Sequence, residues 1–383
     1  MDLRELSATR LMIQRLAGPA VPDPAAAVRE SLAVQSQDVP LALDSLAQRT
    51  RGDAAEARTA LDAGAFVRTH VLRPTWHFVA AEDLRWLLAL TSPKVLSGLT
   101  KRHADLGLGE PARRARLLDA VREALSAGPL TRVALGEHLT QGGLLAKTPV
   151  FGSQVSHVLL IGELEGLWCS GPVDPTGLSG HTYALLDDRL PPVGSLRRSR
   201  EDALVELVGR FFASHGPVSV PDLQRWTRLT QRDVRLAVAA LGDAVEPVEV
   251  AGHVLWCGAC PMAERGPGSP AFVEARERVE GAWLLSTFDE AVLTHNTLRM
   301  PIPASAPHAG QGPRYSEAGG GPVLWNLTDV GVWKRVHRAD RFEVTLRLDP
   351  SLPLRALAAL DAEAHALAVR SGAERAVVTR QAG

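Results

Sequence analysis

The sequence has few cysteines, which excludes a fold held together by disulfide bonds. Only Cys169, Cys257 and Cys260 occur in 383 residues, too few for a disulfide framework. Cys257 and Cys260 form a C-x-x-C pair, but a structural zinc site needs two further ligands, and the sequence has no second C-x-x-C and no H-x3-H. With His253 nearby, a degenerate zinc site is the alternative. We interpret the cysteines as ordinary thiols in a reducing compartment and expect no metal and no cofactor.

Long apolar runs are also missing. Apolar residues make up 45% of the chain, yet no run approaches the roughly 18 uninterrupted apolar residues that cross a bilayer. The first ten residues, MDLRELSATR, lack the basic and then apolar pattern of a signal peptide. We therefore expect a cytoplasmic protein that does not bind a membrane.

Neither sign of charge is in excess. The 42 basic and 43 acidic residues give a net charge of −1, so binding to nucleic acid would need a local basic surface. Five basic residues accompany two acidic ones between residues 101 and 116, and a second basic patch follows at 197–200. These patches favour contacts with the DNA backbone, with an ordinary solvated surface as the alternative. The candidate DNA-binding residues here are Lys101, Arg102, Arg113, Arg114, Arg197 and Arg198.

The first part of the chain predicts helices followed by a hairpin. Apolar spacing and stop signals predict short helices at 7–16, 24–34, 41–49 and 53–63, the last one ending at Gly64 as its C-cap. Residues 66–79 then alternate like a hairpin. Trp76 and Phe78 lie on the face expected in the core, while the opposite face is expected to point outward with Arg73, Thr75 and His77.

The same plan occurs twice more. Residues 115–146 and 200–241 each contain a helical pattern, a Gly-Pro turn and a second helix, and a further helix and two strands complete each copy. The final hairpin is expected to turn at Ala251 and Gly252. Duplicated units are also indicated by the similar phrases SAGPLTRVALGEHL and SHGPVSVPDLQRW. Helices followed by a hairpin are the plan of a winged helix.

The last part of the chain has a different sequence pattern, with linkers and alternating strands in place of repeated helices. A Gly/Pro linker at 263–272 and a long loop at 301–322 precede two or three alternating strands at 323–349, with a turn expected at 329–331, and a helix closes the chain at 351–369. We therefore predict an α+β protein with three tandem winged-helix domains and a C-terminal β-rich domain. The predicted boundaries are 1–107, 108–193, 194–265 and 266–383.

Two neutral amides stand one residue apart at the end of the second predicted helix. In a continuing helix Gln35 and Gln37 would diverge by about 200°, whereas an extended backbone sends both to one side. Pro40 favours an extended residue before it. The pair can donate and accept hydrogen bonds without carrying charge. The alternative is that both glutamines cap local backbone groups.

These features resemble the AlkZ-like winged-helix DNA glycosylases, the family of azinomycin-resistance and interstrand-crosslink glycosylases. Nearly the whole chain follows the family's order, through AVQSQDVPLA, VRTHVLRPTWHFVAAEDLRWLL, SAGPLTRVALGEHL, HVLLIGELEGLWCSG, SHGPVSVPDLQRW and LLSTFDEAVL. The Gln-x-Gln motif of this branch matches Gln35 and Gln37, whereas a sister branch has aspartate in the second place. Ser36 stands where the family commonly has a hydrophobic residue, and the tail segment LWNLTDVGVWKR is less typical.

The resemblance implies a monofunctional DNA glycosylase that excises alkylated purines from duplex DNA, including bulky N7 adducts and interstrand crosslinks. Gln37 would orient the attacking water, and Gln35 would fix the water or the sugar–phosphate. DNA backbone contacts are implied for the hairpin residues Arg68, Arg73, Thr75 and His77. The protein would act as a monomer, with an open surface rather than a snug pocket for one flipped base.

Other interpretations remain open at this point. The helix-turn-helix patterns also suit a non-catalytic transcriptional regulator or, less well, a protein-interaction scaffold. Asp38 is interpreted as a helix-end residue, with an electrostatic role beside a cationic intermediate as the alternative. Asp289 and Glu290 are interpreted as structural, because adjacent side chains rarely point the same way.

Overall fold

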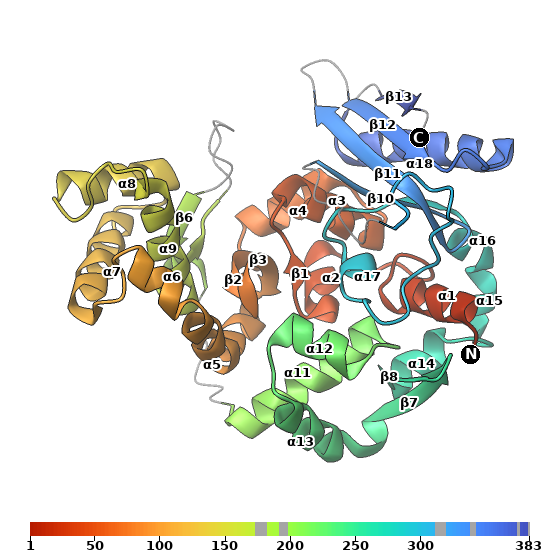
Figure 1. Ribbon diagram of the computed structural model, residues 1–383, viewed down its shortest axis with the longest axis horizontal. Helices are drawn as coiled ribbons and strands as arrows, with labels where there is room; N and C mark the ends of the chain where they lie inside the picture. Colours follow the sequence, from red (N-terminus) through yellow and green to blue (C-terminus); the bar gives the residue numbers. More distant parts are fainter. Residues whose placement is uncertain (173–181, 191–197, 311–318, 338–341, 374–375, 382–383) are drawn as a thin grey trace. The chain divides into compact units, whose positions relative to one another are not determined.

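The computed structural model describes residues 1–172, 182–190, 198–310, 319–337, 342–373 and 376–381. The chain divides into two compact units (Figure 1). The first unit comprises Met1–Arg58, Val205–Arg225 and Gln231–Gly383, and the second comprises Thr59–Leu204 and Trp226–Thr230. Distant parts of the sequence therefore build the first unit together. The division into four domains made from the sequence stays a prediction.

Acidic caps start the N-terminal helices of the first unit. Asp2 and Glu5 form a capping box at the start of α1 (Leu3–Ile13). Asp23 accepts the Ala26 N–H at the start of α2, which has proline at its first position. After α1, this part contains three helices: α2 (Pro24–Ser31), α3 (Val39–Thr50) and α4 (Ala54–Asp62). After α4, Gly64 has φ +79°, as expected for a residue that ends a helix.

The second predicted helix is shorter than expected. It ends at Ser31 instead of residue 34, because Leu32 has φ +66° and ψ −48°, outside the helical region. The short strand β1 (Val34–Gln35) follows. The extended backbone expected at the glutamine motif is therefore present at Gln35.

The predicted helix-turn-helix at 200–241 is confirmed. It consists of α11 (Arg200–His215), α12 (Val220–Thr227) and α13 (Gln231–Leu241), followed by the short 3-10 helix η1 (Gly242–Ala244). The hairpin of β7 (Val245–Val250) and β8 (His253–Gly258) comes next and turns at Ala251 and Gly252, both with positive φ. Val218 also pairs with Trp256 of β8. This order of helices and hairpin is the one expected of a winged helix.

A five-stranded sheet forms the C-terminal part of the first unit. Its strand order is β13-β12-β11-β10-β9, antiparallel except for the parallel pair β12 and β13. The strands are β9 (Ala282–Leu284), β10 (Gly320–Trp325), β11 (Thr328–His337), β12 (Phe342–Leu348) and β13 (Ala376–Gln381). Helix α18 (Leu354–Arg370) connects β12 to β13 and packs on the sheet through Leu360 and Ala364 (Figure 1). Leu41 of α3 belongs to the same apolar core.

The turn expected at 329–331 lies elsewhere. Asn326 and Leu327 have φ of +51° and +62° and form the two-residue connection between β10 and β11. Gly331 lies within β11, where a Cβ would overlap the carbonyl of Arg347 on β12. The glycine therefore marks a close approach of two strands and not a turn.

Short helices occupy much of the segment between the hairpin and the sheet. The linker predicted at 263–272 is in part helical, and the described part of this segment contains α14 (Ala259–Arg265), α15 (Pro270–Glu274), α16 (Arg276–Val279) and α17 (Glu290–Leu293). Trp283 and Leu285 around β9 share an apolar core with Leu11 and Met12 of α1. The C-terminal part therefore packs directly on the N-terminal helices.

The second unit begins with the predicted hairpin. Strands β2 (Phe66–Val71) and β3 (Arg73–Ala80) are antiparallel and turn at Leu72, which has φ +65°. Helices α5 (Ala81–Gly98) and α6 (Thr100–Asp105) follow. All of β2 and the last four residues of β3 are buried, so the expectation of one outward polar face is wrong for this part of the hairpin.

The predicted repeat at 115–146 is also confirmed in the second unit. Its elements are α7 (Pro111–Leu125), β4 (Leu130–Thr131), α8 (Arg132–Gln141), α9 (Phe151–Leu164), β5 (Trp168–Ser170) and β6 (Thr182–Leu185), followed by α10 (Leu186–Arg189). The strands form a sheet of order β4-β6-β5. Trp168, fully buried, packs in the core with Leu117 and Leu135. Three helices and this sheet have the element order of a winged helix, and the count of three such domains stays a prediction.

Candidate active site

The two glutamines of the motif differ in burial. Gln35 in β1 is 7% exposed, whereas Gln37 is exposed in the turn before α3. Asp38 then caps α3 by accepting the Leu41 N–H at 3.1 Å. The two amides, expected on one side of an extended backbone, thus differ in their access to solvent. One amide is therefore fixed in the protein, and the other is open to solvent.

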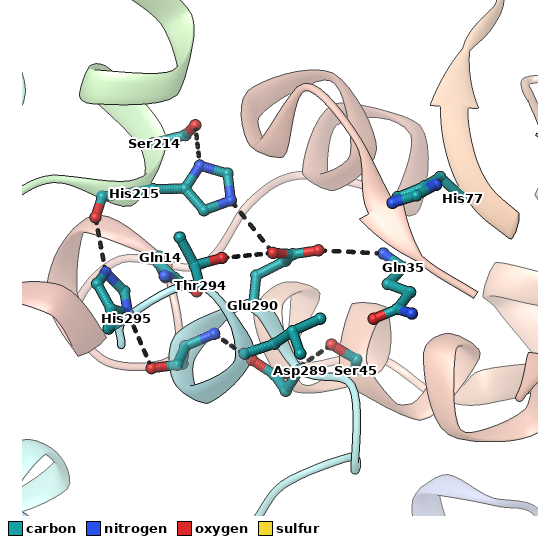
Figure 2. Close-up of polar contacts among 12 residues, drawn as sticks. Gln14, Gln35, Ser45, His77, Ser214, His215, Asp289, Glu290, Thr294 and His295 are labelled. Atoms are coloured by element: carbon teal, nitrogen blue, oxygen red, sulfur yellow. Dashed lines mark hydrogen bonds and ion pairs between the residues drawn. The ribbon is translucent and has the colours of Figure 1, made fainter. Parts of the chain in front are cut away.

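The backbone N–H of Gln35 is hydrogen-bonded to a carboxyl group, whereas its side-chain oxygen accepts no hydrogen bond from the described residues. Its backbone N–H donates to Glu290 Oε1 at 3.3 Å. The side-chain amide points away from Glu290 (Figure 2). Its Oε1 atom is buried and accepts no hydrogen bond from the described residues. An unsatisfied buried acceptor costs roughly 1–3 kcal/mol, and such groups in native proteins call for a functional or structural reason.

Glu290 lies at the start of α17 and is 2% exposed. Thr294 Oγ1, one helical turn further on, donates to Glu290 Oε2 at 2.6 Å. His215 Nε2, at the end of α11, lies 3.7 Å from the same oxygen. Both carboxyl oxygens therefore accept a hydrogen bond, which suits the ionised, acceptor-only form.

Two histidines lie next to this carboxyl group: His215 approaches it directly, and His295 contacts the backbone of His215. Ser214 Oγ and His215 Nδ1 are 2.8 Å apart, and the His215 ring stacks on Phe211. His295 Nε2 lies 2.9 Å from the His215 carbonyl (Figure 2). Burial, together with the nearby charge of Arg10, lowers the pKa of His295 to about 3. His295 is therefore neutral near pH 7 and acts as a fixed hydrogen-bonding partner.

Asp289 points in a different direction from Glu290. It is 1% exposed, and its two oxygens accept from the Arg49 guanidinium at 2.9 Å each. Ser45 Oγ donates to it at 2.6 Å, and the Ala291 N–H at 2.9 Å. Burial alone would raise the pKa of Asp289, but the charge and hydrogen bonds of Arg49 bring it below its ordinary value. The structural interpretation of Asp289 is confirmed: it joins α17 to α3.

Asp38 and Asp44 lie beside one arginine of the C-terminal sheet. Arg335 Nη1 is 3.0 Å from Asp44 Oδ2, and its Nη2 is 3.7 Å from Asp38 Oδ1. Ser371 Oγ donates to Asp44 Oδ1 at 2.9 Å. The helix-end interpretation of Asp38 is confirmed by its cap on α3, and the arginine offsets part of its charge.

The C-terminal part thus supplies partners of both the motif and α3. Sequence reasoning did not find Glu290 as a partner of Gln35, because 255 residues separate the two. The available signal was a carboxylate pair in an apolar segment, STFDEAVL, which excluded neither a structural nor a functional role.

Comparisons with known proteins identify the family of the chain. The sequence pattern of the family described as "DNA glycosylase AlkZ-like" matches residues 28–369. The chain belongs to the AlkZ-like DNA glycosylase family. Among solved structures, the Streptomyces sahachiroi DNA glycosylase AlkZ has a similar fold, with a TM-score of 0.73, 19% identity and 100% of each chain covered. Comparison with curated protein sequences finds no match. Family membership supports a DNA glycosylase role for the AlkZ-like chain.

The hairpin residues of this AlkZ-like protein are less accessible than expected. Arg68 is 3% exposed, and its guanidinium lies 4.3 Å from the centre of the Trp76 ring. His77 is fully buried, with Nδ1 2.9 Å from the Thr75 carbonyl and Nε2 3.2 Å from Arg73 Nη2. The expectation that His77 points outward is therefore wrong. Thr75 and Arg73 are half-buried.

The reason for the buried hairpin lies on α9. Glu163, fully buried, is hydrogen-bonded to His70 Nδ1 and accepts from Trp76 Nε1 at 3.3 Å. His70 and Trp76 of the hairpin therefore have a partner within the second unit, and alternation in the sequence did not reveal it. A DNA-binding role of Arg68, Arg73, Thr75 and His77 stays a prediction.

The basic patches of the AlkZ-like chain are partly exposed. Lys101 and Arg102 on α6 are exposed, and Arg113 and Arg114 on α7 are half-buried. The Arg198 guanidinium lies 4.9 Å from the centre of the Trp86 ring, and Arg197 lies outside the described residues.

Candidate metal ligands lie apart from one another in the described part of the chain. It contains no group of three or more His, Cys, Asp or Glu side chains placed to hold a metal ion. Cys257 is buried in β8, and burial raises the pKa of its thiol to about 12, whereas Cys260 is exposed on α14. Nor does any described helix have the length and apolar character needed to cross a membrane.

Proposed function

We propose that this protein is a monofunctional DNA glycosylase that hydrolyses the N-glycosidic bond of alkylated purines in duplex DNA and leaves an abasic site. The substrate class comprises bulky N7 adducts and extends to interstrand crosslinks. The protein would act as a monomer in the cytoplasm, without a cofactor. The observation that carries the proposal is the buried Oε1 atom of Gln35, an amide acceptor without a hydrogen bond from the described residues.

Neutral amides suit this reaction. A purine alkylated at N7 or N3 is cationic and already a good leaving group, so its departure needs little help from an acid. The protein must then place a water at the sugar C1′ and stabilise an oxocarbenium-like sugar. Gln35 Oε1 would accept a hydrogen bond from that water, and Gln37, which is exposed, would orient it. Neither amide is a strong base, so undamaged nucleotides should resist hydrolysis.

Exposed arginine and lysine would hold the duplex. Lys101 and Arg102 can pair with phosphates and carry no sequence preference. This fits an enzyme that selects a damaged base by its lability. A bulky or crosslinked base cannot swing freely into a closed cavity, so a surface that binds the backbone suits such lesions.

The direct test is base release from duplex DNA carrying N7-alkylguanine. Abasic sites would be revealed by alkaline cleavage of the strand. Wild-type protein should release the base, and Gln37→Ala and Gln35→Ala should each lower the single-turnover rate by about 100-fold or more. Gln381→Ala, at an exposed amide in β13, is the matched control and should keep the wild-type rate. No release by wild type, or full release by Gln37→Ala, would contradict the proposal.

A transcriptional regulator is the second candidate, favoured by the winged-helix order of α11 to β8. A regulator would bind one intact sequence far more tightly than others, commonly as a dimer on spaced half-sites. Binding to many unrelated duplexes with similar affinity would exclude it.

A further inference from the structure

Glu290 bonds the backbone of the residue whose side chain is proposed to hold the water. We propose that Glu290 is a positioning residue: by accepting the Gln35 N–H, its carboxylate fixes the Gln35 peptide and so directs the unused Oε1 atom toward the reacting water. This inference rests on the proposed glycosylase function and adds a residue to its site. It assigns no contact between Glu290 and DNA.

Local structure alone does not hold Gln35 in place. Helix α2 ends at Leu32 with φ +66°, and β1 is only two residues long. The backbone at the motif therefore depends on contacts with other parts of the chain. The bond from Gln35 N to Glu290 Oε1, at 3.3 Å, ties this point to a segment 255 residues away.

Glu290 is itself held firmly. Thr294 occupies its other oxygen at 2.6 Å, and His215 approaches the same oxygen from α11. The preceding residue, Asp289, is bonded to Arg49 and Ser45 of α3, the helix that follows the motif. Because α3 and α17 are joined in this way, the carboxylate and the motif keep a fixed relation to one another.

The same contacts argue against a direct catalytic role for Glu290. Its side chain is 3% exposed, and each of its oxygens already accepts a hydrogen bond. A carboxylate in contact with a reacting water or sugar would need an oxygen that is not already hydrogen-bonded within the protein. The geometry therefore favours an effect through Gln35.

The test compares two substitutions by single-turnover excision at saturating protein. Glu290→Ala removes the acceptor, and the rate constant should fall about 10- to 100-fold, since a displacement near 1 Å can cost about 100-fold. Glu290→Gln keeps an amide oxygen that can accept the Gln35 N–H, so it should stay within about 5-fold of wild type. The Kd for damaged DNA should change less than about 2-fold in both.

Two further variants keep the test decisive. Asp349→Ala removes another buried carboxyl group of the first unit, one bonded to Ser305 and Ser351, and should leave the rate unchanged. Thr294→Val removes only the hydroxyl that holds Glu290 Oε2 and should slow excision about 3- to 10-fold, which gives a readout even where Glu290→Ala does not fold.

The outcomes separate the inference from the function. A wild-type rate for both Glu290→Ala and Thr294→Val would overturn the positioning role. Equal losses in Glu290→Gln and Glu290→Ala would replace it with a role of the negative charge, and an equal loss in Asp349→Ala would show general loosening of the unit. Absence of excision by wild type would instead refute the proposed function.

Discussion

Breaking the ion pair between Arg49 and Asp289 should strongly destabilise the first unit. Its side chains are 3% and 0% exposed, and the two N–O distances are 2.9 Å. Removing one partner of a buried, bidentate pair leaves an uncompensated charge and costs about 3–5 kcal/mol. We expect Asp289→Asn and Arg49→Met each to lower the free energy of unfolding by about this amount.

A double-mutant cycle measures the coupling between the two side chains. In the combined variant no charge is left alone, so its loss should be at least about 2 kcal/mol smaller than the sum of the single losses. Because the chain has two compact units, calorimetry is the suitable measurement: only one of the unfolding transitions should move. Additive losses, or single losses below about 1 kcal/mol, would refute the reasoning.

The same pair gives a pH dependence of known sign. The folded-state pKa of Asp289 lies below its ordinary value, because Arg49 lowers this pKa by more than burial raises it. Its contribution to stability is therefore present at neutral pH and lost as the pH falls through that lowered pKa. In Arg49→Met this acid-dependent loss should disappear, and an unchanged acid profile of the single variant would count against the assignment.

Other substitutions test separate features. Burial raises the pKa of Asp44 from 3.8 to about 6, so its contribution to stability falls by about 3 kcal/mol as the pH rises from about 4 to above 6. Asp44→Asn should remove this fall in urea unfolding measured across that range, and an unchanged slope would contradict it. Gly162→Ala would place a Cβ against the buried Trp168 ring and should cost about 1–3 kcal/mol in urea unfolding, where a wild-type midpoint would contradict the packing. Lys101→Glu should weaken binding to any duplex and reduce the slope of log K against log salt by about 1, and loss at only one sequence would point to base reading.

Local signals in the sequence predicted the elements well. Apolar spacing, the glycine after α4 and the pair Ala251 and Gly252 act within a few residues of chain, and the elements that they predicted are present. The two helix-turn-helix segments were found for the same reason. Their apolar spacing and Gly-Pro turns are local properties.

Features that depend on distant partners could not be predicted in this way. Strand β13 pairs in parallel with β12 across α18, and its short sequence carries no sign of that partner. Gly331 resembled a turn residue because the carbonyl of Arg347 is close only in the folded sheet. His77 alternated like a surface residue, yet contacts with Arg73 and the Thr75 carbonyl accompany its burial.

Some features of the glutamine motif depend on neighbouring residues, and others depend on distant parts of the chain. The break of α2 before Gln35 and the cap at Asp38 follow from nearby residues, and the resemblance to a family drew attention to the pair. The burial of Gln35 and its bond to Glu290 follow from how the C-terminal part packs on α3, which no spacing within the motif encodes.

The bond between Gln35 and Glu290 also has a consequence for synthesis of the protein. A ribosome makes Gln35 among the first tenth of the chain, but Asp289 and Glu290 emerge only after three quarters of it. A nascent or prematurely terminated polypeptide lacking them cannot complete this part of the fold, because contacts so far apart form only once both segments exist. Fragments would therefore be poor catalysts, and base removal from the genome would be confined to finished molecules.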